Sequence, residues 1–161
     1  MKLKVVLIYL LLLAVFTGNY PAQASYAKQS DKVQKPHEYT TYEIAAEITG
    51  CPEYILRGIA FAESTFRADA VGDDGMSFGR YQINEKFHDY YAEQYGEYNP
   101  FCPLESAILT GRIFMDNLLA LGNIEDAIAA HRQGRTGVRN NGRTQWYVDR
   151  VLGYSEGENK I

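Results

Sequence analysis

The feature that most constrains the fold is the spacing of apolar residues in two segments, 52–63 and 103–121. In each segment apolar side chains fall on one face at helical spacing, as on the inward face of an α-helix. These positions are Ile55, Leu56, Ile59 and Ala60 in the first segment, and Leu104, Ile108, Phe114 and Leu118 in the second. A proline opens each segment and a Gly-Asn pair follows the second, as expected at helix starts and ends. We therefore expect a mainly α-helical chain.

Shorter helices and a minor β element complete the expected fold. The remaining helices are predicted from a capping box at Thr40–Glu43 to Gly50, over residues 85–95, from Ile124 to Gln133 with Gly134 as the end, and from about Thr144 to Leu152. Strand signal is limited to Ser77 to Asn84 and one small hairpin partner. The expected class is mainly α, of the α+β type, with a small β-hairpin after the helix over 52–63.

The first 24 residues have the organisation of a signal peptide. Lys2 and Lys4 precede an apolar run from Val5 to Phe16, and Ala22-Gln23-Ala24 supplies the small residues that precede a cleavage site. A membrane-spanning helix needs roughly 20 apolar residues, so this run is short for one. An uncleaved N-terminal anchor is the alternative. We expect the protein to be exported, to the periplasm or to the cell wall and beyond.

The rest of the chain is expected to form one domain. Residues 25–38 are polar and without periodicity, which predicts a flexible leader. Residues 39–155 suffice for a single core, and residues 156–161 are expected to be a tail.

The charge balance disfavours two classes of partner. The chain has 16 basic and 20 acidic residues, and the expected signal peptide removes two of its lysines. A net negative protein is poorly suited to nucleic acid or to anionic membrane surfaces. Arginines are nevertheless concentrated near the end, at Arg132, Arg135, Arg139, Arg143 and Arg150. They form either a solvated helix face or a patch that contacts an acidic polymer.

The cysteine pair predicts a disulfide. Cys51 and Cys102 are the only cysteines, and an even pair in an exported chain is typically bonded. Such a bridge would stabilise the fold by about 4 kcal/mol. Two buried free thiols are the alternative. The three histidines lie far apart in the sequence, so no metal site is expected.

Glu63 is an unusual residue at the end of the apolar helix. It follows Ile55 and Ile59 at intervals of four residues, so it shares their face. Burial and the negative end of a helix both disfavour a carboxylate anion. A carboxyl group that keeps its proton near neutral pH is what a general acid requires. The alternative is an ordinary glutamate that points to solvent at a frayed helix end.

The residues after Glu63 resemble the soluble lytic transglycosylases, which are related in fold to goose-type lysozymes. The first motif of that family is a Glu-Ser pair that ends a buried helix, here Glu63-Ser64. The second is a glycine, two variable residues and Gln-Ile, here Gly79 to Ile83. Between them lies the glycine-rich segment that contains Ser77, and both Ser77 and Gln82 are suited to hydrogen-bond a polar ligand beside Glu63. The resemblance covers roughly residues 52–154.

The third and fourth motifs of the family are matched less closely. The third is Ala-Tyr-Asn-x-Gly, and this chain has Ala130-His131-Arg132-Gln133-Gly134. The frame and the glycine are retained, but the tyrosine and asparagine are replaced, so the sugar contacts of those residues are in doubt. His131 is either a helix cap or a sugar contact. The fourth motif is a tyrosine that opens the last helix, here Tyr147, which in the family lies close to the catalytic acid.

The resemblance implies a peptidoglycan lytic transglycosylase with a lysozyme-like fold and no cofactor. Glu63 would be the general acid and base that cleaves the β-1,4 bond from N-acetylmuramic acid to N-acetylglucosamine and leaves a 1,6-anhydro end. The substrate-binding candidates are Ser64, Ser77, Tyr81, Gln82, His131 and Tyr147. For the tyrosines, packing at the rim of a small core is the alternative to stacking on sugar rings. The expected partner is a glycan strand, bound by a monomer.

Two alternatives remain open. A hydrolytic muramidase on the same fold would activate water, usually with a second carboxylate nearby, for which Asp73 and Asp74 are the candidates. Their simpler interpretation is that of turn-forming residues before Gly75. The other alternative is a non-catalytic module that binds the cell wall.

Overall fold

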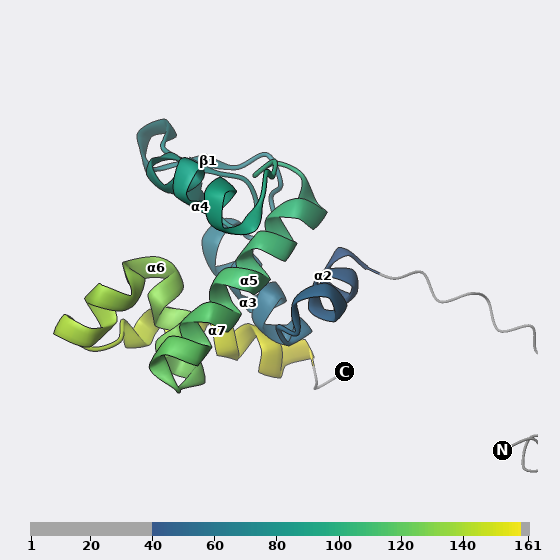
Figure 1. Cartoon of the computed structure of the whole chain (residues 1–161). Helices are drawn as coiled ribbons and strands as arrows, with labels where there is room; N and C mark the ends of the chain where they lie inside the picture. Colours follow the sequence, from purple (N-terminus) through teal and green to yellow (C-terminus); the bar gives the residue numbers. More distant parts are fainter. Residues whose placement is uncertain (1–39, 159–161) are drawn as a thin grey trace, which may run out of the picture. The chain divides into compact units, whose positions relative to one another are not determined.

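The computed structural model describes residues 40–158, with side chains to residue 154, as part of one compact unit. The predicted signal peptide and leader lie outside the described residues. Within them the chain is mainly helical with a small sheet, which confirms the predicted class (Figure 1). The helices are α2 (Thr41–Thr49), α3 (Glu53–Ser64), α4 (His88–Tyr95), α5 (Pro103–Leu121), α6 (Ile124–Asn141) and α7 (Gln145–Glu158), with short 3-10 turns at Asp73–Gly75 and Glu85–Phe87.

The sheet differs in detail from the prediction. Its three antiparallel strands are β1 (Val71–Gly72), β2 (Ser77–Phe78) and β3 (Ile83–Asn84), in the order β1-β2-β3. The segment from Ser77 to Asn84 is therefore two strands rather than one. A turn at Gly79–Gln82 separates them, because Gly79 and Gln82 both adopt positive φ angles, of 72° and 48°. Figure 1 shows β1 and α4 at one end of the unit.

Several helix ends follow from local chemistry. The side chain of Thr40 accepts from the backbone N–H of Glu43, and the carboxylate of Glu43 accepts from the N–H of Thr40, so the capping box before α2 is confirmed. Gly50 and Gly122 end α2 and α5 in the left-handed conformation. The predicted bounds of α5 are those observed.

The last two helices are longer than predicted. Gly134 does interrupt α6, with φ 72° and ψ 160°, but helical structure resumes and continues to Asn141. The chain then turns into α7, which runs to Glu158 and so includes part of the expected tail. A glycine breaks helical geometry only locally, and the residues after it can form a new turn.

The core is built around α3, which packs against α7, while α5 packs against α2 and α6. Ile55, Leu56 and Ile59 are fully buried. The contact between α3 and α7 is close at Gly58, where a Cβ would lie 2.4 Å from the carbonyl oxygen of Val151. Five residues later on α3, and four earlier on α7, Glu63 meets Tyr147, so the two helices run antiparallel.

The inward face of α5 is rotated from the predicted one. Phe114 is buried, but Leu104, Ile108 and Leu118 are only half-buried. The deepest positions include three polar residues, Ser106, Thr110 and Asn117. A periodicity based on apolar residues alone could not include these polar residues. Asn117 is accommodated because its Oδ1 accepts from Nε of Arg135, at 2.7 Å.

The two cysteines are free, and the expected disulfide is not formed. Cys51 is buried at the start of α3, where burial raises the pKa of its thiol from 9.0 to about 12. Cys102 is half-buried and directly precedes α5. The disulfide was predicted from the number of cysteines and the expected compartment, and neither of these determines how two residues are placed in a fold. Within residues 40–158, no helix is long and apolar enough to cross a membrane.

Candidate active site

Glu63 lies in the last turn of α3, where the backbone leaves the helix. Thr65 and Phe66 both adopt positive φ angles, of 51° and 68°, and their N–H groups bond to the carbonyls of Phe61 and Ala60. The helix therefore ends sharply, one residue after Glu63. The Glu63 side chain is only 14 % exposed. It is neither a solvated residue at a frayed end nor completely enclosed.

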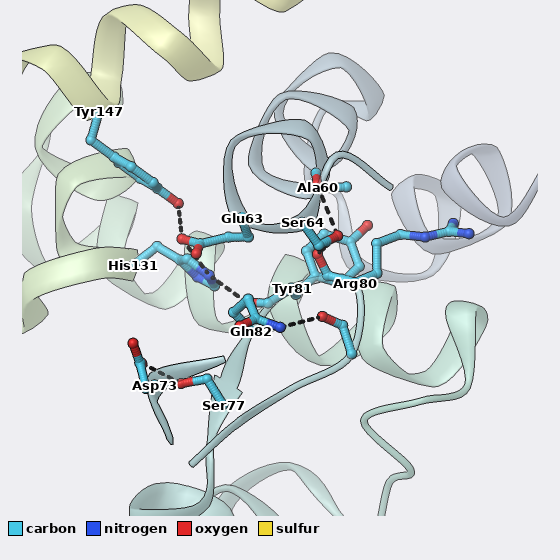
Figure 2. Close-up of polar contacts among 11 residues, drawn as sticks. Ala60, Glu63, Ser64, Asp73, Ser77, Arg80, Tyr81, Gln82, His131 and Tyr147 are labelled. Atoms are coloured by element: carbon cyan, nitrogen blue, oxygen red, sulfur yellow. Dashed lines mark hydrogen bonds and ion pairs between the residues drawn. The ribbon is translucent and has the colours of Figure 1, made fainter. Parts of the chain in front are cut away.

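A tyrosine from α7 contacts this carboxylate. The hydroxyl of Tyr147 donates a hydrogen bond to Oε1 of Glu63, at 2.5 Å (Figure 2). Tyr147 is itself 1 % exposed. Burial, and then the negative charge and hydrogen bond of Glu63, raise the pKa of Tyr147 well above its ordinary value. The phenol therefore remains a neutral donor across the whole range in which a carboxyl exchanges its proton.

A histidine from α6 lies near the same Glu63 oxygen. Nε2 of His131 is 3.9 Å from Oε1 of Glu63 and 3.3 Å from the carbonyl oxygen of Tyr81. The imidazole is 9 % exposed. If Nε2 carries the proton, the ring donates to that carbonyl and presents an N–H dipole near the carboxylate. Three helices thus converge on one carboxylate, as Figure 2 shows.

Gln133 is a site-building residue that sequence reasoning missed. Its Nε2 donates to the carbonyl of Gly142 at 2.7 Å, and its Oε1 accepts from the backbone N–H and the hydroxyl of Thr144. Thr144 in turn begins α7, because its carbonyl accepts from the N–H of Tyr147. One side chain therefore links the middle of α6 to the start of α7. The only sequence signal was its place between His131 and the glycine of the third motif.

Ser64 has a role inside the protein. It is 6 % exposed, and its hydroxyl donates to the carbonyl of Arg80, at 2.8 Å. This bond ties the end of α3 to the turn between β2 and β3 (Figure 2). The hydroxyl thus positions the loop, and a contact of Ser64 with a ligand stays a prediction.

Gln82 also braces the loop. Its side-chain amide donates to the carbonyls of Gly79, at 2.9 Å, and Ala70, at 3.4 Å. A Cβ at Gly72 would lie 2.2 Å from Oε1 of Gln82, so a side chain there would displace the Gln82 amide. The amide nitrogen expected to face a ligand therefore holds the sheet and its turn together.

Ser77 and the two aspartates form a turn at the sheet. Ser77 is buried, donates to Oδ2 of Asp73 at 2.6 Å and accepts from Nδ2 of Asn84 at 3.3 Å. Asp73 and Asp74 are exposed and have positive φ angles, of 50° and 55°. The hydrogen bond of Asp73 and the conformation of both residues favour the turn-forming interpretation.

Tyr81 belongs to the core. Its side chain is fully buried, which favours the packing alternative over stacking on a sugar ring. Its hydroxyl has no hydrogen-bond partner among residues 40–158. What Tyr81 offers the site is its backbone carbonyl, which contacts His131. Trp146, which precedes Tyr147, is 55 % exposed.

No family model matches this sequence, and neither a curated protein nor a solved structure does. The function must therefore be inferred from the residues themselves.

A separate hollow lies between the end of α4 and the start of α5, and it contains none of the predicted site residues. Its lining includes Tyr95, Tyr98, Glu105, Ile108 and Arg112. The described residues contain no group of three or more His, Cys, Asp and Glu side chains arranged to hold a metal.

The arrangement around Glu63 is suited to proton transfer. Among the described residues, Oε2 of Glu63 accepts no hydrogen bond, while Oε1 is held by Tyr147. A carboxyl group fixed through one oxygen presents the other in a defined direction. Such a group can give a proton to a bound ligand and later take one back.

Proposed function

We propose that this protein is an exported peptidoglycan lytic transglycosylase with Glu63 as its general acid and base. The observation that carries the proposal is the position of Glu63, which ends a buried helix with one oxygen held by Tyr147. The Glu63-Ser64 and Gly79-to-Ile83 motifs support it, because both contribute to that position. Ser64 bonds to the backbone of the second motif, and Gln82 braces its turn.

In the first half of the proposed reaction, Glu63 acts as an acid. It gives its proton to the bridging oxygen of the β-1,4 bond, and the bond from C1 of N-acetylmuramic acid to that oxygen breaks. The N-acetylglucosamine side leaves as an alcohol, and positive charge develops at C1. The substrate's own N-acetyl group can stabilise that charge, so no protein nucleophile is required.

In the second half, Glu63 acts as a base. The carboxylate takes the proton of the 6-hydroxyl of the same muramic acid, and that oxygen attacks C1 to close a 1,6-anhydro ring. No water is consumed, and Glu63 regains its proton. The O–H of Tyr147 would stabilise the carboxylate between the two halves, since a donated hydrogen bond favours the ionised form. His131 would contribute its N–H dipole from the other side.

The fold is consistent with this proposal. A helix that ends in the acid, a small antiparallel sheet after it and a following helical body are the arrangement that the resemblance to lysozyme-like enzymes implies. We propose that the chain has that fold. The carboxylate of Asp73 accepts from Ser77 in a tight turn, which agrees with the turn-forming interpretation of this residue.

Mass spectrometry of muropeptides tests the proposal. The full chain is incubated with purified peptidoglycan beside Glu63→Gln, which keeps the shape of the side chain but cannot transfer a proton. Glu53→Gln is the matched control, because it makes the same change at the half-exposed start of the same helix.

We expect products that lack a reducing end and are lighter by one water from the wild type and from Glu53→Gln, and none from Glu63→Gln. Reducing-end products would replace the proposal with a hydrolytic muramidase and direct attention to Asp73 and Asp74. Equal release by Glu63→Gln and wild type would refute the assigned role of Glu63. If the wild type releases no muropeptides, the proposed enzymatic activity is refuted and a wall-binding module is favoured.

A further inference from the structure

An arginine lies on an exposed tryptophan at the edge of the Glu63 site. The guanidinium carbon of Arg132 is 4.7 Å from the centre of the Trp146 ring and 5.8 Å from that of the Tyr147 ring. Both members of this Arg132–Trp146 pair are exposed, Trp146 by 55 %. A guanidinium stacked on an aromatic face keeps its N–H donors free in the plane of the group.

The position of the pair relative to Glu63 follows from its sequence neighbours. Arg132 comes directly after His131, and Trp146 directly before Tyr147, the two residues that lie against the Glu63 carboxylate. The rings of Trp146 and Tyr147 are perpendicular, with centres 5.9 Å apart. The pair therefore extends the site outward from α6 and α7 towards solvent.

The charge of Arg132 reaches the site. Burial and Glu63 raise the pKa of Tyr147, and the positive charges of Arg132 and Arg150 oppose that rise. Arg132 is thus close enough to influence the groups around Glu63 electrostatically.

Arg132 has no acidic partner among the described residues, unlike Arg143, which lies between α6 and α7. Arg143 forms ion pairs with Glu125 and Asp126, the latter at 2.9 Å. Arg135 donates to Asn117, and Arg139 to the carbonyl of Ala120. The arginine-rich end of the chain is therefore not one uniform basic patch. At the edge of the Glu63 site, it offers a positive charge that no carboxylate of the described residues neutralises.

We propose that Arg132, held on Trp146, binds a carboxylate of the glycan substrate beside the bond that Glu63 cleaves. This inference rests on the proposed function, and it names a carboxylate as the substrate group that Arg132 recognises. A planar guanidinium binds a carboxylate through two parallel N–H donors, and the tryptophan reduces the entropy that the arginine would lose on binding.

Peptidoglycan offers this carboxylate from two sources. The lactyl group of N-acetylmuramic acid carries a free carboxylate when the peptide stem has been removed. When the stem is present, the lactyl carboxyl is an amide, and the carboxylates lie further out on the peptide. Neutral sugar rings could also stack on Trp146, but such contacts would be indifferent to the charge of the substrate.

The test compares cleavage and binding across three substrates. These are stem-free glycan strands, the same strands with their carboxylates converted to amides by carbodiimide and ammonia, and strands that keep their peptide stems. The variants are Arg132→Gln and, as a matched control for charge, Arg139→Gln, which changes another exposed arginine of α6. Cleavage is measured as kcat/KM, and binding by cosedimentation with each variant in a Glu63→Gln background.

We expect Arg132→Gln to lower kcat/KM and binding by about tenfold or more on strands with carboxylates, since one hydrogen bond to a charged group is worth about tenfold to hundredfold. On amidated strands it should change neither. The loss on stem-free strands assigns the lactyl carboxylate, and a loss confined to stem-bearing strands assigns the peptide. Arg139→Gln should follow the wild type.

The outcomes separate the two proposals. Cleavage by the wild type with equal rates for Arg132→Gln on every substrate overturns this inference and leaves the proposed function standing. An equal loss on charged and amidated strands also overturns it, in favour of stacking on Trp146. Carboxylate-dependent binding without any cleavage upholds the role of Arg132 and refutes the proposed enzymatic activity. Absence of glycan binding overturns the inference.

Discussion

The hydroxyl of Tyr147 donates to the carboxylate of Glu63 across 84 residues of sequence. The antiparallel packing of α3 and α7 makes this contact possible, since Gly58 allows the helices to approach closely. His131 is the other polar side chain near this carboxylate, with its Nε2 3.9 Å from Oε1 of Glu63. The contact therefore couples the packing of the core directly to the group proposed to transfer the proton.

Replacement of Tyr147 by phenylalanine should slow the proposed reaction without unfolding the protein. The variant keeps the buried ring but removes the donor to Glu63, and a hydrogen bond to a charged group is worth about tenfold to hundredfold in rate. Peptidoglycan release should fall by that factor, with the thermal midpoint within a few degrees of wild type. Tyr81→Phe is the control, because the hydroxyl of this equally buried tyrosine has no partner among residues 40–158. An undiminished rate in Tyr147→Phe would exclude a role for this hydroxyl.

Gln133 should act as a positioning residue for the start of α7. Gln133→Ala removes the bonds to Gly142 and Thr144, so we expect a loss of about 1–3 kcal/mol in the free energy of unfolding. Hydrogen exchange should be faster at the amide of Tyr147, which bonds to the carbonyl of Thr144. Gln145→Ala is the control, since Gln145 bonds only within α7. Unchanged exchange at Tyr147 in Gln133→Ala would show that the link is dispensable.

The turn between β2 and β3 should not tolerate a side chain at Gly79. Its φ of 72° is unfavourable for other residues, and a Cβ would lie 1.8 Å from the carbonyl oxygen of Pro100. Gly79→Ala should therefore destabilise the fold by about 3 kcal/mol or more in urea unfolding. Gly75→Ala is the comparison, because φ is also positive there but nothing lies within 4 Å of the new Cβ. It should cost only about 1–2 kcal/mol. Equal losses of stability in Gly79→Ala and Gly75→Ala would mean that the positive φ angle, and not the contact with Pro100, causes the destabilisation.

Local chemistry was the part of the fold that the sequence predicted well. The capping box at Thr40 and the bounds of α5 depend on residues a few positions apart, and both agree with the structure. The rotation of α5 and the resumption of α6 after Gly134 did not follow from such patterns. Both depend on long-range contacts, such as that of Arg135 with Asn117.

The candidate site could be predicted only in outline. Spacing placed Glu63 on the buried face of α3, but its contact with Tyr147 was implied by the family resemblance alone. The same resemblance assigned Ser64, Tyr81 and Gln82 to a ligand, whereas the structure uses two of them to hold the loop and one in the core. A polar residue of a sequence motif can either contact the ligand or hold the neighbouring backbone in place, and both roles require the same residue type. Sequence cannot distinguish the two roles, because it does not show where each donor is used.

The buried thiol of Cys51 should make the protein sensitive to alkali. Burial raises its pKa from 9.0 to about 12, so the unfolded chain loses this proton at a lower pH than the folded protein. The stability that the neutral thiol contributes is therefore present in full below about pH 9 and is lost as pH rises towards 12. By pH 10.5 the loss is roughly 2 kcal/mol. Urea unfolding of wild type and Cys51→Ala at pH 7 and pH 10.5 measures this loss of stability.

The wild type should lose more stability over this interval than Cys51→Ala, although the variant starts lower because it has a small cavity. Tyrosine ionisation affects both proteins and cancels in the comparison. Ile55→Val, which removes a methyl group from the same core but no titratable group, should follow the wild type. Alkylation in denaturant without reductant, read by intact mass, should label both cysteines, as expected for free thiols. Equal losses of stability in wild type and Cys51→Ala would contradict the raised pKa of Cys51. A protein that is not alkylated would show that the two cysteines form the disulfide predicted from the sequence.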